Sequence, residues 1–127
     1  MSRSNARESV FKLIFEYVFN KEKDVDLFDE IKLEQIAEQS YITEMYNGII
    51  NNYDELCKII ADSSQGFAFD RIYKVDLAIL LVALYEIKYM ESIPVKVSIN
   101  EALNLAKTYS TEKSNKFING ILASVVE

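Results

Sequence analysis

Basic residues at two separate places in the chain could bind phosphate groups. The first place is the N-terminal segment, where Arg3 and Arg7 stand four residues apart and Lys12 follows about one turn later. Residues four apart share one face of a helix, and a guanidinium fork matches two phosphate oxygens. The segment predicts an anion-binding helix start, although an ordinary solvated first turn would use the same residues.

The second place is the segment S-T-E-K-S-N-K-F at residues 110–117. It supplies cations at Lys113 and Lys116, a hydroxyl at Ser114 and a ring at Phe117. An aromatic ring beside basic residues can stack an unpaired base while the lysines hold phosphates. Phe117 also falls on the apolar stripe of the expected last helix, so a core position is the alternative.

Residue types suited to catalysis or metal binding are scarce. The chain has no histidine, and Cys57 is its one cysteine, so a zinc site is not expected. The glycines at 48, 66 and 120 are scattered, and no glycine-rich phosphate-binding motif occurs. We therefore expect a binding protein without a cofactor, not an enzyme.

Composition indicates one globular domain, spanning residues 1–127. The chain has 127 residues, of which 50% are apolar, enough to bury a core. A lone cysteine fits a reducing compartment. The apolar run at residues 77–85 is far shorter than the roughly 20 residues that span a bilayer, and no secretory signal is visible. We expect a cytoplasmic protein with no membrane segment.

The acidic residues are concentrated in the middle of the chain. Residues 24–62 contain ten acids and two bases, a net charge of −8, while the whole chain carries −6. Residues 1–23 and 88–127 are each slightly basic. An acidic total opposes nucleic-acid binding, but this distribution permits a nucleic-acid face built from the two ends.

Hydrophobic periodicity predicts an all-α fold of six or seven helices. Apolar residues recur at helical spacing in four long segments and one short one, which are Ser4–Asn20, Leu27–Glu38, Thr43–Ala61, Val75–Met90 and Phe69–Tyr73. The segment Val75–Met90 is apolar nearly all round, which is typical of a central helix.

Two further helices are expected after the break that Pro94 imposes. Ser98, with Glu101 three residues later, predicts a capping box at the start of the next helix. A turn at Ser110–Lys113 precedes the last helix, in which Gly120 would permit close approach of the first helix.

Three stretches of the chain resemble the NusB family, small RNA-binding factors of transcription antitermination. They are A-R-E-x-x-x-K-L-I-F near the N-terminus, D-R-I-Y-K-V-D-L-A-I-L-L-V-A-L-Y-E-I from Asp70 to Ile87, and I-N-E-A-x-x-L-A-K-x-Y followed by S-x-K-F-I-N-G-I-L. Residues 20–65 match only in helical pattern. The resemblance implies one all-α domain of two packed helical subdomains that share a core.

The resemblance also implies a function and a set of contacts. NusB-like proteins bind the boxA element of nascent RNA with NusE, a ribosomal protein of the small subunit, and join the elongating RNA polymerase, chiefly on ribosomal RNA operons. The family's RNA contacts correspond here to Arg3, Arg7, Lys12, Glu112, Lys113, Ser114 and Phe117. Its NusE contact corresponds to Asp76, Ile79 and Leu80 on the central helix.

Departures from the family pattern leave alternatives open. Ser4 and Asn5 occupy positions that are often arginine, Lys113 stands where an acidic residue is frequent, and Leu81 replaces a common arginine. A protein-interaction module with weak or lost RNA binding is therefore the alternative function. An appendage of an RNA cytosine methyltransferase is a third, for which a chain ending at Glu127 leaves no room. The free protein could be a monomer or a homodimer that hides its RNA face.

Overall fold

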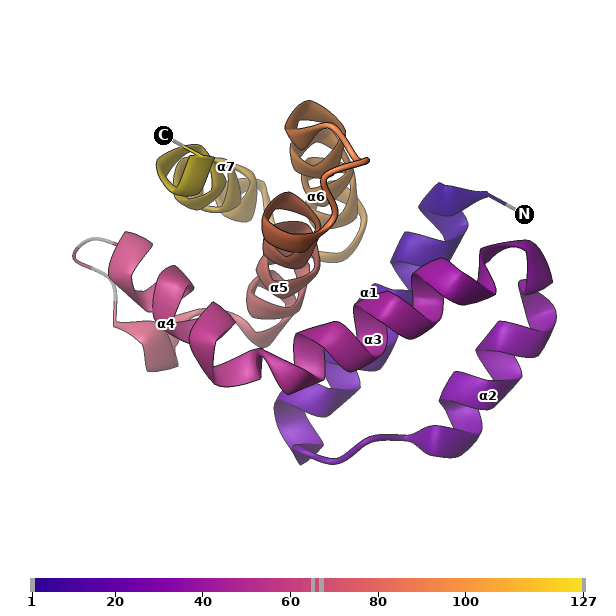
Figure 1. Cartoon of the computed structure of the whole chain (residues 1–127). Coiled ribbons are helices and arrows are strands. Elements are labelled where there is room, and N and C mark those ends of the chain that lie inside the picture. The colour runs from indigo at the N-terminus through magenta and orange to yellow at the C-terminus, as the bar shows by residue number, and fades with distance from the viewer. Residues whose placement is uncertain (1, 65, 67, 127) are drawn as a thin grey trace.

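The computed structural model describes residues 2–64, 66 and 68–126, and in these residues it contains seven α-helices, two short 3-10 helices and no strand (Figure 1). The all-α prediction is confirmed. The α-helices are α1 Arg3–Asn20, α2 Val25–Glu34, α3 Gln39–Asn51, α4 Tyr53–Ser63, α5 Lys74–Tyr89, α6 Val95–Tyr109 and α7 Glu112–Val126, with η1 at Ile36–Glu38 and η2 at Phe69–Arg71. Within the described residues, every helix is too short or too polar to cross a membrane.

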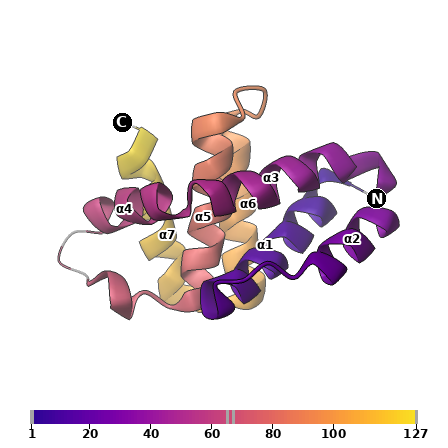
Figure 2. The same cartoon turned by 60° about the horizontal axis from the view of Figure 1, so that its bottom comes forward.

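Helix α5 is the centre of the molecule because it is apolar on every side. All residues from Leu77 to Tyr85 are buried, and helices α1, α3, α4, α6 and α7 all pack against α5. Figures 1 and 2 show α1–α3 on one side of α5, and α4 and α7 on the other. The two groups of helices therefore share one core through α5.

The helix predicted over Thr43–Ala61 is wrong, because two helices occupy this region and meet at Asn52. The Asn52 backbone leaves the helical region, with φ −113° and ψ 20°. Its N–H donates to the Gly48 carbonyl at 3.0 Å and its side-chain amide donates to the same oxygen at 2.8 Å. The Gly48 carbonyl therefore accepts two hydrogen bonds from Asn52 at the point where α3 ends.

The predicted capping box at Ser98 is also wrong. Helix α6 begins three residues earlier, directly after Pro94, whose φ of −60° suits a helix start. Ser98 lies inside the helix, is buried, and donates its hydroxyl to Glu86 Oε1 at 2.7 Å. The Glu101 carboxylate accepts from Arg7 and Ser4 of α1 instead of from the backbone.

Close packing requires a glycine at position 48, not at position 120. A Cβ on Gly120 would meet no atom within 4 Å, so the expected approach of the first helix there does not occur. A Cβ on Gly48 would lie 2.1 Å from the hydroxyl oxygen of Tyr85. Helix α3 therefore needs this glycine to accept the Tyr85 ring of α5.

Candidate nucleic-acid interface

The first two turns of α1 place Arg3 and Arg7 on one face, as predicted, but that face is turned toward α3. The Ser2 hydroxyl caps the helix by accepting from the Asn5 N–H at 3.1 Å. Both guanidinium carbons lie over the ring of Tyr41, at 4.3 Å for Arg3 and 5.7 Å for Arg7. Arg3 keeps 45% of its side chain exposed, and its Nε donates to Glu38.

Arg7 is enclosed by its partners. Its Nε donates to Glu86 at 2.7 Å and its Nη1 to Glu101 at 2.6 Å, and only 4% of the side chain is exposed. Glu86 is fully buried and also accepts from the hydroxyls of Tyr41 and Ser98. Residues of α1, α3 and α6 therefore converge on one carboxylate of α5, and the Arg7 guanidinium offers no surface to a phosphate.

The same cluster fixes the protonation of its members. Burial opposes ionisation of Glu101, but hydrogen bonds from Ser4 and Asn104 and the charge of Arg7 outweigh it, so the Glu101 pKa lies below its usual value. Burial is the main reason that the pKa of Tyr41 is raised. The Tyr41 phenol therefore keeps its proton and serves as a donor.

Lys12 lies on a different face of α1 from the two arginines. It is exposed, and its Nζ is 5.9 Å from the ring centroid of Tyr109 at the end of α6. The Tyr109 hydroxyl donates to Glu8, and its ring lies 5.0 Å from that of Phe11. Tyr109 therefore joins the middle of α1 to the junction between α6 and α7.

Serine hydroxyls anchor the start of α7 to the first turn of α5. Ser110 donates to one carboxylate oxygen of Asp76 at 2.6 Å, and Ser114 donates to the other at 2.8 Å. Asp76 and Ser114 are both buried, and Thr111 accepts from the Ser114 N–H at 3.3 Å. The predicted RNA contact Ser114 therefore directs its hydroxyl inward, where it positions the neighbouring Lys113.

The start of α7 exposes Glu112, Lys113 and Lys116, and it borders a pocket of about 240 Å³. Phe117 is half-buried: it packs against the core, and it also lines this pocket. Arg71 and Tyr73 line the same pocket. Neither of these two residues was selected from the sequence. The signal that could have revealed them is Tyr73, an aromatic residue immediately before the buried helix α5.

Arg7 and Lys113 are not neighbours. Arg7 contacts Glu86 near the end of α5, whereas Lys113 follows the segment anchored to Asp76 near its start. Ten residues of helix separate the two carboxylates, about 15 Å at the usual rise. Lys12, not Arg7, is the cation of α1 that lies next to the α6–α7 junction.

The expectation that Ile79 and Leu80 contact a partner has to be corrected. Both side chains are fully buried in the core, and Asp76 is 3% exposed. A buried side chain offers no surface to another protein, because α5 is enclosed by helices on all sides. Hydrophobic periodicity correctly predicted that α5 is central, whereas the family resemblance implied partner contacts on this same buried helix.

The described residues contain no group of three or more His, Cys, Asp or Glu side chains that could hold a metal ion. Cys57 is half-buried on α4, and burial is the main reason that its thiol pKa is raised. A protonated, partly covered thiol is a poor nucleophile.

Comparisons with known proteins agree with the fold and the sequence motifs. The NusB family model matches residues 4–127. A transcription antitermination protein NusB from Agathobacter rectalis is 43% identical over 128 residues, covering 97% of this chain and 98% of that protein. The protein of the same name from Listeria innocua is 37% identical over 126 residues, covering 98% and 96%.

Solved structures share the same fold. NusB from T. maritima superposes with a TM-score of 0.84 at 31% identity, covering 98% of this chain and 90% of that chain. A structure of antitermination factors NusB and NusE in complex with dsRNA gives a TM-score of 0.84 at 23% identity, covering 97% and 94%. Sequence relatives, family model and fold agree over nearly the whole length, and the chain belongs to the NusB family.

Proposed function

We propose that this protein is a transcription antitermination factor that binds boxA-like single-stranded RNA together with NusE. It then joins the elongating RNA polymerase and supports transcription of ribosomal RNA operons. The observation that carries the proposal is the full-length similarity, at 37–43% identity, to proteins named for transcription antitermination. Its role is binding and not catalysis, and its place of action is the cytoplasm, where bacterial polymerase transcribes.

Four exposed cations support an RNA face at one end of the molecule, namely Lys12, Arg71, Lys113 and Lys116. None of the four forms an ion pair with a residue that the structure describes. Tyr109 of α6 lies against Lys12 of α1, and Asp76 of α5 holds the start of α7, which carries Lys113 and Lys116. Cations without a carboxylate partner can neutralise phosphates, which supplies most of the affinity for a nucleic-acid backbone.

Arg7 enters this proposal as a positioning residue, since its guanidinium is occupied by two carboxylates. Asp76 is also a positioning residue, because it accepts hydrogen bonds from Ser110 and Ser114 and so holds the start of α7. Arg3 is half-exposed and remains a proposed RNA contact, with Glu38 as the competitor for its charge.

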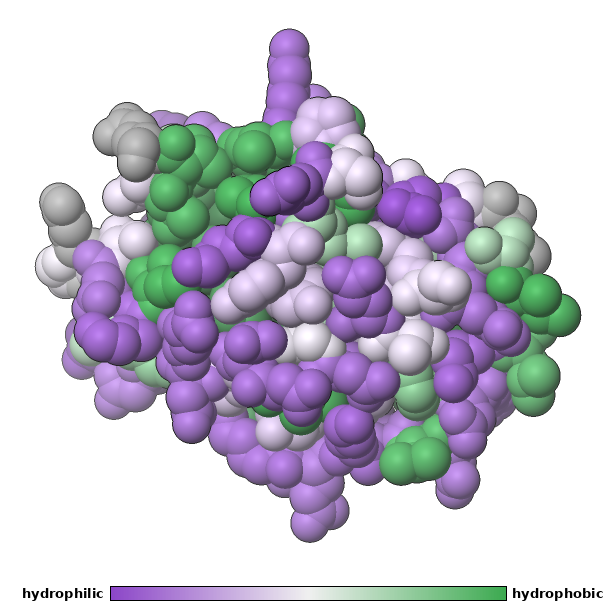
Figure 3. Space-filling view, in the orientation of Figure 1, coloured by the Kyte–Doolittle hydropathy of each residue, from purple (hydrophilic) through white to green (hydrophobic). Residues whose placement is uncertain are grey.

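For NusE we propose a surface at the other ends of α6 and α7. Exposed apolar side chains there include Val97, 42% exposed, and Val126, 43% exposed. Figure 3 shows apolar surface over these two helices. Contiguous exposed apolar surface is typical of protein–protein contacts. A basic partner would also compensate for the acidity of this chain, because it would add positive charge for RNA phosphates to a shared groove.

One observation favours the alternative, an interaction module with weak or lost RNA binding. The two N-terminal arginines are engaged by Glu38, Glu86 and Glu101, so α1 contributes little free positive charge. Under this alternative NusE would hold the RNA, and this chain would bind only NusE.

Titration of labelled boxA-like RNA with and without NusE tests the proposal. We expect salt-dependent binding that NusE strengthens and that scrambled RNA does not reproduce. No gain from NusE, together with equal affinity for scrambled RNA, would count decisively against it. Retention of RNA by the heterodimer after Lys12→Ala and Lys113→Ala are combined would favour the alternative.

A further inference from the structure

The pocket beside the start of α7 is too small for a drug-sized ligand. Its volume is about 240 Å³, below the roughly 300–1,000 Å³ typical of such ligand sites. It lies between the first turns of α5 and α7 and the η2 segment. A site of this size suits one flat ring or one large side chain.

Two aromatic rings line the pocket. Tyr73 immediately precedes α5 and is 62% exposed, so most of its ring is open to solvent. Phe117 is half-buried and presents part of its ring to the same space. Exposed rings of this kind stack nucleobases, because every base has a π-face.

The charges at the pocket favour an anionic ligand. Arg71 and Lys113 are exposed and form no ion pair within the described part of the chain. Asp76 also borders the pocket, and both of its carboxylate oxygens accept serine hydroxyls. Arg71, Lys113 and Asp76, the three charged residues that line the pocket, carry a net charge of +1. The pocket adjoins the starts of two helices, α5 and α7, whose dipoles favour negative charge there.

We propose that this pocket holds one unstacked base of the bound single-stranded RNA. The base stacks on Tyr73 and contacts Phe117, and its flanking phosphates lie on Arg71 and Lys113. This inference rests on the proposed RNA-binding function and adds a third segment, residues 71–73, to the RNA face. A purely apolar partner side chain would leave both cations without a counter-charge, which is why we choose RNA over protein.

Binding of labelled boxA-like RNA to the complex with NusE tests the pocket, using RNAs that carry one abasic nucleotide at successive positions. We expect Tyr73→Ala to weaken binding roughly 5- to 150-fold, the range for losing one stacked base. Tyr73→Phe keeps the ring and should bind like the wild type. An abasic nucleotide at one position should lower the affinity of the wild type for RNA by a comparable factor. The Tyr73→Ala variant should bind that abasic RNA as tightly as it binds intact RNA.

Tyr89→Ala is the matched control. Tyr89 is 39% exposed at the opposite end of α5, about 22 Å from the pocket at the usual helical rise. Tyr73 is largely exposed, so its replacement does not endanger folding, and circular dichroism checks this directly.

The outcomes separate the pocket from the function it rests on. Wild-type binding that neither Tyr73→Ala nor any abasic position weakens would overturn the pocket and leave RNA binding intact. Loss of NusE affinity in Tyr73→Ala, with RNA affinity unchanged, would make the pocket a protein contact and overturn the base proposal. A wild type that binds no RNA, with or without NusE, would overturn both.

Discussion

Arg7 is a buried cation whose removal should cost more than that of its neighbour Arg3. Glu86 is fully buried, and Arg7→Ala would leave its carboxylate without a cation. Breaking a buried pair in this way costs about 3–5 kcal/mol, so we expect a loss near the lower end, because two hydroxyls still serve Glu86. Urea denaturation of the free protein measures this loss in the free energy of unfolding.

Arg3→Ala is the control for this prediction. It removes a partly exposed pair with Glu38 and should cost below about 1 kcal/mol. Equal losses for the two variants would contradict the assignment of Arg7 as a buried positioning residue.

Glu101 should make stability depend on pH on the acid side. Its pKa is lowered in the folded protein from an ordinary value of 4.5, so the folded state favours the charged form. The contribution is fully present above the unfolded pKa and is lost as the pH falls through the folded one. We expect Glu101→Gln to reduce the free energy of unfolding at neutral pH, with the difference from wild type shrinking below about pH 4.5. A difference that stays constant down to the folded pKa would exclude this explanation.

The sequence predicted the order of the helices, but it merged α3 and α4 into one element and placed the start of α6 three residues too late. The stripe of buried residues continues across the α3–α4 break, with Ile49 before it and Leu56 and Ile60 after it. Periodicity therefore could not reveal the break, at which the backbone N–H and the side chain of Asn52 both donate to the Gly48 carbonyl. The capping-box motif at Ser98 and Glu101 failed for another reason, since tertiary partners in α5 and α1 claim both side chains.

The two helical glycines should respond oppositely to alanine. Gly48→Ala would place a Cβ 2.1 Å from the Tyr85 hydroxyl oxygen, and overpacking of this kind typically costs about 1–3 kcal/mol. Gly120→Ala meets nothing within 4 Å on an exposed face of α7, so it should stabilise by roughly 0.5–1 kcal/mol. Thermal unfolding followed by circular dichroism compares the two. A Gly48→Ala variant as stable as the wild type would show that the Tyr85 ring moves aside freely.

Across the packed fold, the motifs singled out segments near both ends of the chain but did not show which of their side chains face outward. Lys12 and Lys113 are exposed as expected, whereas Arg7 and Ser114 are buried by partners 79 and 38 residues away in sequence, Glu86 and Asp76. Only the packed fold can decide such pairings, because helical spacing fixes the face of a residue and not what covers it. Arg71 and Tyr73 were missed because the pocket depends on α7 lying beside the start of α5.

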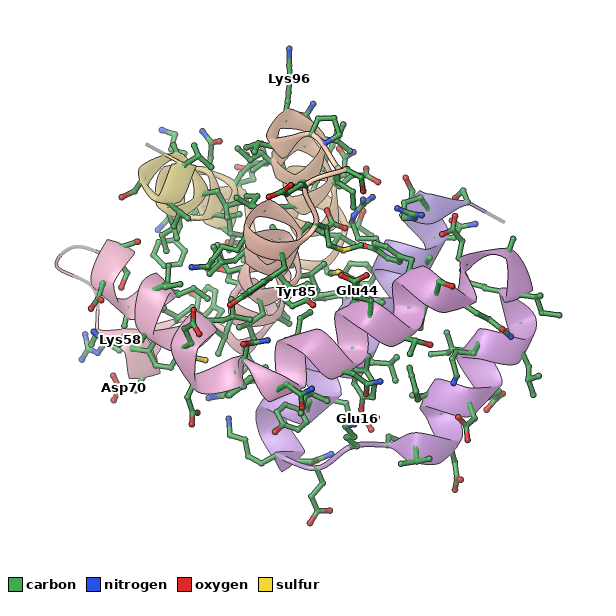
Figure 4. The ribbon with its side chains drawn as sticks, viewed as in Figure 1. Glu16, Glu44, Lys58, Asp70, Tyr85 and Lys96 are labelled. Atoms are coloured by element: carbon green, nitrogen blue, oxygen red, sulfur yellow. The ribbon has the colours of Figure 1, made fainter. Side chains whose placement is uncertain are left out.

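The separation of charge across the molecule leads to a prediction about salt. Lys113 lies at the proposed RNA face, whereas Lys96 projects from the start of α6, far from Asp70 and the η2 segment next to the pocket (Figure 4). Each phosphate contact on a single strand contributes roughly 0.7 to the slope of log affinity against log salt. We expect Lys113→Ala to weaken RNA binding by the complex and to lower the slope by about that amount. The two lysines carry the same charge and are both exposed, so with NusE at saturating concentration Lys96→Ala alters the net charge equally and should change neither quantity. Equal effects of the two variants would mean that the total charge of the chain, and not a localised face, governs its affinity for RNA.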